Sequence, residues 1–191
     1  MNSKSFPKIS LITPSYNQGD FLEDTILSVL NQGYPNLEYI IIDGGSSDNS
    51  VEILKKYEKH LQYWVSEQDD GQYCAINNGL SVATGDVFAW LNSSDFYLPW
   101  TLKTVGSIFS ELSDVSWLTT LNKLVFSEDG YCVNNRQVPA YSKKAFFDGC
   151  HLPIWPRNLG WIQQESTFWR RGLWEKVGGL NLSCQYAADF D

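Results

Sequence analysis

The segment Leu37-Glu-Tyr-Ile-Ile-Ile-Asp43, followed by Gly44-Gly45-Ser46, decides the fold class of this 191-residue chain. Its apolar side chains, rich in isoleucine, form an almost continuous run, which is typical of a buried β-strand. The glycines and the serine after Asp43 favour a tight loop, so the strand is expected to end at this point.

Similar apolar runs lie before and after this segment and alternate with amphipathic stretches. In the first such stretch, Asp20 is expected to cap a helix, with Glu23 completing a capping box. Strands that alternate with helices imply right-handed crossovers and a mostly parallel sheet. The expected strands are Lys8–Thr13, Leu37–Asp43, Leu61–Ser66 and Asp86–Leu91, and the expected helices run from Asp20 to Gly33, over Val51–Tyr57 and Gln72–Ala83, and from Pro99.

The pattern becomes less regular after Val115, where the apolar runs are shorter. We expect a smaller, mixed β region there, within the same single α/β domain. Its expected strands are Val115–Thr119, Leu121–Phe126, Tyr131–Val133 and Glu165–Trp169, and its expected short helices are Tyr141–Phe147 and Gly172–Val177.

The composition narrows the range of partners and locations. With 14 basic and 22 acidic side chains, the net charge is −8, which argues against a nucleic-acid partner because such binding depends on basic patches. No apolar run approaches the roughly 18 residues of a membrane helix. The first eight residues also lack the apolar core of a signal peptide, so a cytoplasmic location is expected.

The cysteines and the glycines lack the spacing of common cofactor sites. The four cysteines are scattered, with no C-x-x-C pair, which favours reduced thiols over structural zinc. Neither G-x-x-x-x-G-K-[ST] nor G-x-G-x-x-G occurs, so the P-loop and dinucleotide-binding motifs are excluded. Any bound phosphate would therefore depend mainly on a divalent cation for positive charge.

Polar residues follow each expected strand of the first half. Ligands of open parallel sheets bind beyond the carboxyl ends of the strands. A tyrosine there can stack on a base, and a carboxylate can accept hydrogen bonds from a base imide N–H or from ribose hydroxyls. Each acidic residue could instead cap the following loop, but the convergence of four such ends favours a binding site. The four ends are Pro14–Asn17, Asp43–Ser46, Asp69–Gln72 and Asn92–Asp95.

An ordered series of motifs resembles the family 2 glycosyltransferases, including enzymes of colanic-acid and other polysaccharide biosynthesis. The resemblance extends over nearly the whole chain and implies a GT-A fold, in which a Rossmann-like, mostly parallel sheet is flanked by helices. The motifs are Ile12-Thr-Pro-Ser-Tyr-Asn17, Tyr34-Pro-Asn-Leu-Glu-Tyr-Ile-Ile-Ile-Asp-Gly-Gly-Ser-Ser-Asp48, Asp69-Asp-Gly-Gln72, Trp90-Leu-Asn-Ser-Ser-Asp95 and Gln163-Gln-Glu-Ser-Thr-Phe-Trp-Arg-Arg171.

The resemblance implies a transferase that moves a sugar from a UDP, GDP or dTDP donor to a glycan or lipid-linked acceptor. Inversion at the sugar and a role in cell-surface polysaccharide biosynthesis are further expectations. Residues 1–110 would form the nucleotide-sugar-binding half and residues 111–191 the acceptor-side half. Because relatives usually continue into further helices, we expect this chain to be truncated at its C-terminus. Because acceptors in this family are often lipid-linked, peripheral contact of the protein with the inner face of a membrane is a further expectation.

The resemblance also assigns roles to individual residues. The general base would be Asp189, and Asp95 would bind the divalent cation, Mn²⁺ or Mg²⁺. Trp161 and Gln164 are candidate acceptor contacts, since tryptophan faces stack on sugar rings, although core packing is an equal alternative for Trp161. The expected donor-binding residues are Pro14, Ser15, Tyr16, Asp43, Gly71, Gln72, Asn92 and Ser93.

One position departs from the pattern of the family. Ser94 stands where related sequences usually carry the metal-binding aspartate. Either Asp95 takes over, or metal binding is weakened, or the catalytic role is lost. The alternative function is therefore a non-catalytic module that binds a nucleotide sugar or a glycan, with a degenerate metal site. A nucleotidyltransferase usually needs a glycine-rich loop with a basic residue, which Pro14–Gly19 lacks.

Overall fold

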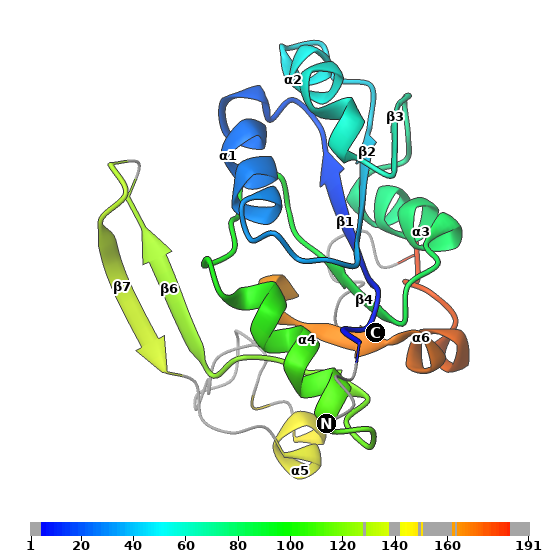
Figure 1. Cartoon of the computed structure of the whole chain (residues 1–191), viewed down its shortest axis with the longest axis vertical. Helices are drawn as coiled ribbons and strands as arrows, with labels where there is room; N and C mark the ends of the chain where they lie inside the picture. The colour runs from blue at the N-terminus through cyan, green and yellow to red at the C-terminus, as the bar shows by residue number, and fades with distance from the viewer. Residues whose placement is uncertain are drawn as a thin grey trace. The chain divides into compact units, whose positions relative to one another are not determined.

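The computed structural model describes residues 5–127, 129–137, 142–148, 150, 162 and 164–183 (Figure 1). The chain forms two compact units. The first unit combines Met1–Trp117 with Phe168–Asp191, and the second consists of Leu118–Thr167. The first unit is therefore discontinuous in sequence, and it contains the parallel sheet.

The sheet of the first unit has the strand order β3-β2-β1-β4-β8-β5. The four strands on one side of it run parallel, as the alternation of strands and helices predicts, and β8 is antiparallel to β4. The α/β fold class and the mostly parallel central sheet are thus confirmed. The strands are β1 (Ile9–Ser15), β2 (Leu37–Asp43), β3 (Tyr63–Ser66), β4 (Val87–Trp90), β5 (Trp117–Leu118) and β8 (Phe168–Arg170).

Helices cover both sides of this sheet, and Figure 1 shows α1 on one side of β1 and α3 on the other. The close approach of α3 depends on Gly79. A Cβ at this position would lie 2.7 Å from Cγ2 of Ile12 in β1. The helices of this unit are α1 (Gly19–Leu30), α2 (Ser50–Tyr57), the 3₁₀ turn η1 (Glu58–His60), α3 (Gln72–Val82), α4 (Thr101–Glu111) and α6 (Arg171–Val177).

The core on the α3 side is built from isoleucine and aromatic side chains. Trp90 on β4 and Trp169 on β8 meet edge to face, with ring centroids 5.4 Å apart. The ring centroid of Trp174 on α6 lies 5.8 Å from that of Trp169. Ile12 and Ile76 are fully buried in the same cluster. This packing joins α3 and α6 to the middle of the sheet.

Arg170 connects β8 to α4. Its Nε donates to the carbonyl of Val115 at 2.7 Å, and Nη2 donates to the carbonyl of Phe109 at 2.8 Å. The guanidinium lies 5.0 Å from the centre of the Phe109 ring. The positive charge of Arg170 at the C-terminal end of α4 also interacts favourably with the partial negative charge of the helix dipole there.

Two predicted helix starts are wrong. The first helix begins at Gly19, and Asp20 lies within its first turn rather than at its cap. The acceptor comes from another loop, because Asp48 Oδ2 accepts the Gly19 N–H at 2.8 Å. Glu23 pairs with Lys56 and Tyr57 instead of completing a capping box. The fourth helix starts at Thr101, two positions after Pro99.

The second unit contains a β-hairpin of β6 (Asn122–Phe126) and β7 (Cys132–Gln137), with a bulge at Val125/Phe126. It also holds α5 (Lys143–Phe147) and the 3₁₀ turn η2 (Gln164–Ser166). The predicted strand from Glu165 is therefore wrong in its first residues, which form a turn. In the described part of the chain, no helix is both long and apolar enough to cross a membrane.

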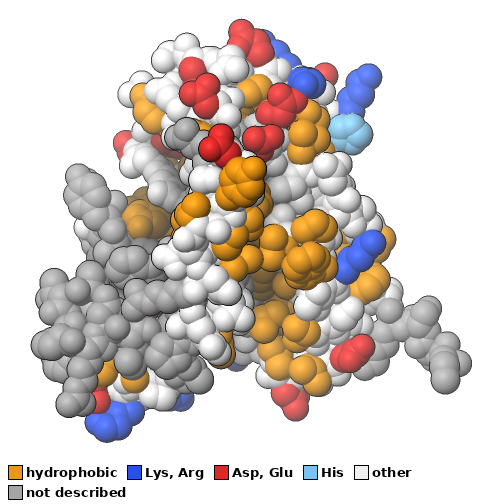
Figure 2. All heavy atoms as spheres, turned by 90° about the vertical axis from the view of Figure 1, so that its left-hand side faces the viewer, with side chains coloured by type: hydrophobic (Ala, Val, Ile, Leu, Met, Phe, Trp, Pro, Cys, Tyr) orange, Lys and Arg blue, Asp and Glu red, His pale blue; other side chains and the backbone are white. Residues whose placement is uncertain are grey.

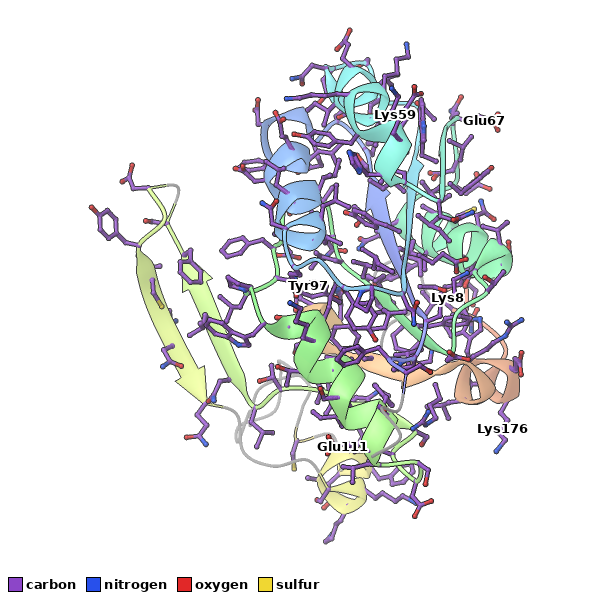
Figure 3. The ribbon with its side chains drawn as sticks, viewed as in Figure 1. Lys8, Lys59, Glu67, Tyr97, Glu111 and Lys176 are labelled. Carbon is purple, nitrogen blue, oxygen red and sulfur yellow. The ribbon has the colours of Figure 1, made fainter. Side chains whose placement is uncertain are left out.

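A buried carboxylate lies at the edge of the sheet where β1 begins. In Figure 3, the label of Lys8 marks this edge, and the label of Glu67 marks the opposite end of the sheet, where β3 ends. Glu38 is only 3% exposed. Its Oε1 accepts hydrogen bonds from Lys8 Nζ and Thr84 Oγ1, both at 2.6 Å, and Oε2 accepts from Ser10 Oγ and the Thr84 N–H. Burial alone would raise the pKa of Glu38, but these hydrogen bonds outweigh burial and lower the pKa to about 2.

We predict that this network makes the fold sensitive to acid. The pKa of Glu38 in the folded state lies below the ordinary value of 4.5. The stabilisation of the folded state by the Glu38 carboxylate is therefore complete above pH 4.5 and is lost as the pH falls toward 2. The shift corresponds to about 3 kcal/mol of unfolding free energy. Urea unfolding of the wild type and Glu38→Gln between pH 7 and pH 3 measures the larger part of it, about 2 kcal/mol. A Glu38→Gln variant with the wild-type pH dependence would contradict this assignment.

Candidate functional site

A cavity of about 580 Å³ lies at the carboxyl ends of β1, β2 and β4, within the size range of small-molecule sites. It brings together the strand-end loops that the sequence pattern identifies. The lining residues are Pro14, Ser15, Tyr16, Gln18, Gly44, Gln68, Asp69, Gly71, Gln72, Ala75, Asn92, Ser93 and Ser94.

The register of the parallel strands explains this convergence. Ser15 lies opposite Asp43, and Asp43 lies opposite Ser66, so β1, β2 and β3 end at one level. The predicted donor-binding residues that line the cavity are Pro14, Ser15, Tyr16, Gly71, Gln72, Asn92 and Ser93. The remaining one, Asp43, lies behind the cavity wall.

Asp43 is fully buried, and its carboxylate is held by neighbouring donors. The hydroxyl of Ser46 donates to Oδ1 at 2.5 Å, while the Ser46 N–H at 2.9 Å and the Ser66 hydroxyl at 2.6 Å donate to Oδ2. These bonds fix the turn that places Gly44 in the cavity wall. Asp43 therefore shapes the site from behind.

A second set of hydrogen bonds joins the loop after β1 to the loop after β2. The Asn17 N–H donates to Ser46 Oγ at 2.8 Å, and Asn17 Oδ1 accepts from the Ser47 N–H at 2.9 Å. Asn17 has a φ of 51°, a region that asparagine enters more readily than most residues. The neighbouring Tyr16 is held at the cavity with 62% of its surface exposed, so a flat aromatic face is available to a ligand.

The N-terminus of α3 also faces the cavity, because Gly71, Gln72 and Ala75 line it. No side chain caps this end, and no acidic residue lies in its first turn. The partial positive charge of a helix N-terminus favours anions there. Gln72 Nε2 donates to Asn92 Oδ1 at 2.7 Å, which joins α3 to the loop after β4.

The charge of the cavity is unusual for a phosphate site. Its lining contains no lysine or arginine and one carboxylate, Asp69. Figure 2 shows further carboxylates gathered in the upper part of one face, at the height of α2 in Figure 1. The described side chains that line the cavity therefore supply no positive charge to a diphosphate.

A divalent cation would find few protein ligands in this part of the chain. Asp95 does not line the cavity, and its Oδ2 accepts from Asn92 Nδ2 at 3.1 Å. Ser94 does line the cavity but offers a neutral hydroxyl. Among the described residues, no group of three His, Cys, Asp or Glu side chains is arranged for a metal. The described lining therefore fits only a cation that is held mainly by the phosphates of a ligand.

The acceptor and base assignments fall largely outside the described residues, which include neither Trp161 nor Asp189. Gln164 lies in η2 of the second unit, where its amide nitrogen and oxygen are buried. The structure shows no hydrogen-bond partner for either atom within the described ranges.

Several cavity residues were not among the individually predicted donor-binding residues, although Gly44, Asp69 and Ser94 lie within the predicted strand-end segments. Asp69 is the most polar of them, and it directly follows the β3 region that the strand-end rule identifies. The strand-end rule identifies the segment after β3, but it does not say which side chain of that segment lines the cavity. The others are Gln18, Gly44, Gln68, Ala75 and Ser94.

Comparison with known sequences gives one consistent result. The sequence model described as Glycosyl transferase family 2 matches residues 10–125. An uncharacterized glycosyltransferase of Mycobacterium tuberculosis is 33% identical over 189 residues, covering 97% of this chain and 67% of the relative. The Bacillus subtilis protein named "Putative teichuronic acid biosynthesis glycosyltransferase TuaG" is 44% identical over 94 residues, covering 47% of this chain and 36% of the relative.

Solved structures share the fold. TarS 1–349 of S. aureus in complex with UDP has a TM-score of 0.71 at 20% identity, covering 96% of this chain and 53% of TarS 1–349. The mannosyltransferase PcManGT of Pyrobaculum calidifontis, in complex with GDP-Man and Mn²⁺, has a TM-score of 0.63 at 19% identity, covering 92% of this chain and 48% of PcManGT. The chain thus spans about half the length of these structures, and the expected GT-A fold is confirmed.

Asp43 gives a test of how the site is built. We predict that Asp43→Ala lowers the free energy of unfolding by about 2–4 kcal/mol, because it leaves the Ser46 and Ser66 donors without their acceptor. Urea unfolding at neutral pH measures the change. Glu111→Ala, at an exposed position labelled in Figure 3, is the control and should change stability by less than about 0.5 kcal/mol. Equal effects of the two substitutions would contradict the role given to Asp43.

Proposed function

The chain belongs to glycosyl transferase family 2, and we propose that its cavity binds a nucleoside diphosphate sugar whose sugar the protein transfers to an acceptor hydroxyl. The observation that carries this proposal is the convergence of the exposed Tyr16 ring, polar loop residues and the uncapped N-terminus of α3 on one cavity. A nucleotide sugar presents a flat base, a ribose and a diphosphate, which require a stacking surface, hydrogen-bonding groups and positive charge, respectively.

The base and ribose would lie between Tyr16, the Gly44 turn and the loop after β3. Asn92 and Ser93 offer an amide and backbone groups to ribose hydroxyls, and Gln72 holds the Asn92 amide in a fixed orientation. Asp43 contributes by fixing the turn at Gly44. The UDP bound to TarS and the GDP-Man bound to PcManGT support a donor of the UDP or GDP type, and dTDP is chemically close to UDP.

The diphosphate would lie against the N-terminus of α3 and Ser15. Ser15 lines the cavity, and its buried Oγ has no hydrogen-bond partner within the described ranges. The Mn²⁺ bound with GDP-Man in PcManGT supports a divalent cation here, held by the phosphates and Asp95. When bound, such a cation would stabilise the charge that develops on the departing diphosphate.

The roles proposed for the acceptor side follow from the chemistry of three further residues. Asp189 would act as the general base that takes the proton from the acceptor hydroxyl in an inverting transfer. Trp161 and Gln164 would contact an acceptor glycan, and a lipid-linked acceptor would bring the protein to the cytoplasmic face of a membrane. The name of the B. subtilis relative supports a role in cell-surface polysaccharide biosynthesis.

The second candidate function is a binding module without catalytic activity. Ser94 in the cavity wall favours it, because a neutral hydroxyl binds a dication that faces a diphosphate less well than a carboxylate. Donor hydrolysis and sugar-transfer assays distinguish this module from an enzyme.

We predict that the wild-type chain binds at least one of UDP, GDP and dTDP by isothermal titration calorimetry, more tightly with Mn²⁺ than without it. Asp189→Asn should retain this binding, since a general base contributes to the chemical step rather than to donor affinity. Glu111→Ala serves as the distant control. The absence of binding to any of the three nucleotides, with and without Mn²⁺, would refute the proposed donor site.

We further predict that Ser94→Asp strengthens Mn²⁺-dependent nucleotide binding about tenfold, equivalent to about 1.4 kcal/mol. The added carboxylate would face the cavity that Ser94 lines, where it can bind the cation. Ser113→Asp adds the same charge at an exposed position outside the cavity and should leave the affinity unchanged. If both variants respond alike, position 94 does not face the cation.

A further inference from the structure

The sheet edges of the described strands differ in their protection against pairing with another chain. The large sheet ends at β3 on one side and at β5 on the other, and β6 and β7 form a separate sheet. Proteins protect the unpaired N–H and C=O groups of an edge with very short strands, prolines or charged side chains. β5 spans only Trp117–Leu118, and β6 and β7 contain Lys123 and Arg136, respectively.

The edge at β3 lacks this protection. Its sequence is Tyr63-Trp-Val-Ser66, which contains no charged residue and no proline, and its aromatic and β-branched residues favour strands. Tyr63 is 44% exposed and the next three residues are only partly buried, whereas β1 is buried along its whole length. Among the described strands, β3 pairs with β2 alone. Its outer side is therefore an apolar edge that can accept another strand.

The two ends of β3 carry opposite charges. The segment Lys55–His60 before the strand contains three lysines and one acidic residue, whereas Glu67–Asp70 after it contains three acidic residues and no basic one. Lys59 and Glu67, both labelled in Figure 3, are exposed. The ion pairs formed between described residues involve neither of them. Both charges are therefore available to a partner.

This charge pattern favours one orientation of a second copy of the chain. If two copies paired their β3 strands in parallel, like charges would meet at both ends. In an antiparallel pair related by a two-fold axis, the basic end of each strand lies beside the acidic end of the other, so the attraction occurs twice. This arrangement is closed, because each copy covers the β3 edge of the other.

We propose that the chain forms a two-fold symmetric dimer by antiparallel pairing of two β3 edges, with Lys59 of each copy close to Glu67 of the other. The large sheet then continues from one copy into the other. A strand of four residues buries less surface than a standard interface of roughly 1,600 Å². We therefore expect a reversible dimer with a dissociation constant on the order of 10 μM.

Sedimentation velocity over a series of protein concentrations measures the dissociation constant. Raising the salt concentration from about 50 mM to about 500 mM should weaken the wild-type dimer roughly fivefold, because salt screens exposed charges. Amide hydrogen exchange locates the interface, and it should become slower in β3 as the protein concentration rises.

A charge-reversal cycle tests which residues meet. Lys59→Glu alone, or Glu67→Lys alone, brings like charges together at both contacts and should weaken the dimer about tenfold. Combining Lys59→Glu with Glu67→Lys restores opposite charges and should restore the wild-type dissociation constant. The matched controls are Lys176→Glu and Glu111→Lys, the same reversals at exposed positions outside β3 and its flanking segments. They should leave the dimer unchanged.

Tyr63→Lys tests the edge independently of its two ends. It places a positive charge near the two-fold axis in both copies, and a lysine on an edge strand opposes pairing, so the dimer should be lost. Val177→Lys adds the same charge at another exposed apolar position, on α6, and should keep the dimer.

Three results would overturn the inference. They are a wild type that stays monomeric at concentrations about tenfold above the expected dissociation constant, a dimer whose affinity is the same in the single and the combined charge reversals, and a dimer in which exchange slows outside β3 only. The inference does not depend on nucleotide binding. A monomer that binds a nucleotide would thus contradict the dimer and leave the proposed function intact.

Discussion

Ser15, Asp43 and Ser66 lie opposite one another across three parallel strands, and the site depends on this alignment. Because the strands end at one level, the loops that follow them meet at one edge of the sheet. The buried Asp43 carboxylate then joins two of these ends by accepting from Ser46 and Ser66. A single buried carboxyl side chain and its three donors thus hold the shape of the cavity wall.

Among the described residues, no basic side chain lines the cavity in which we propose that a polyanion binds. The net charge of the chain is −8, and the cavity lining contains Asp69 but neither lysine nor arginine. Within the described residues, positive potential at the cavity comes from the N-terminus of α3, which is held against the sheet by the contact of Gly79 with Ile12. Donor affinity in such a site would depend more on the base, the ribose and an accompanying cation than on direct ion pairs.

Sequence patterns were sufficient for the sheet and for the location of the cavity. Apolar runs such as Leu37–Asp43 give the strands, and the rule of carboxyl ends gives the loops. They did not reveal contacts between residues far apart in the chain. The acceptor at the start of α1 comes from Asp48, and the different access of Asp43 and Asp69 depends on where Ser46 and Ser66 donate. Periodicity and propensity contain no information on such contacts, so the cap and the accessible carboxylate required the structure.

The hydrogen bond from the Arg170 N–H to the carbonyl of Ser116, at 2.8 Å, has a consequence for how this family can vary. It joins the two points between which the whole second unit, Leu118–Thr167, is inserted. With both ends fixed on one sheet, lengthening the inserted segment adds only a loop-closure entropy that grows logarithmically, about 0.6 kcal/mol for each doubling. The inserted unit can therefore change in size and sequence while the parallel sheet of the first unit keeps its strand order. Length and sequence can diversify within such an insertion at little cost to the stability of the first unit.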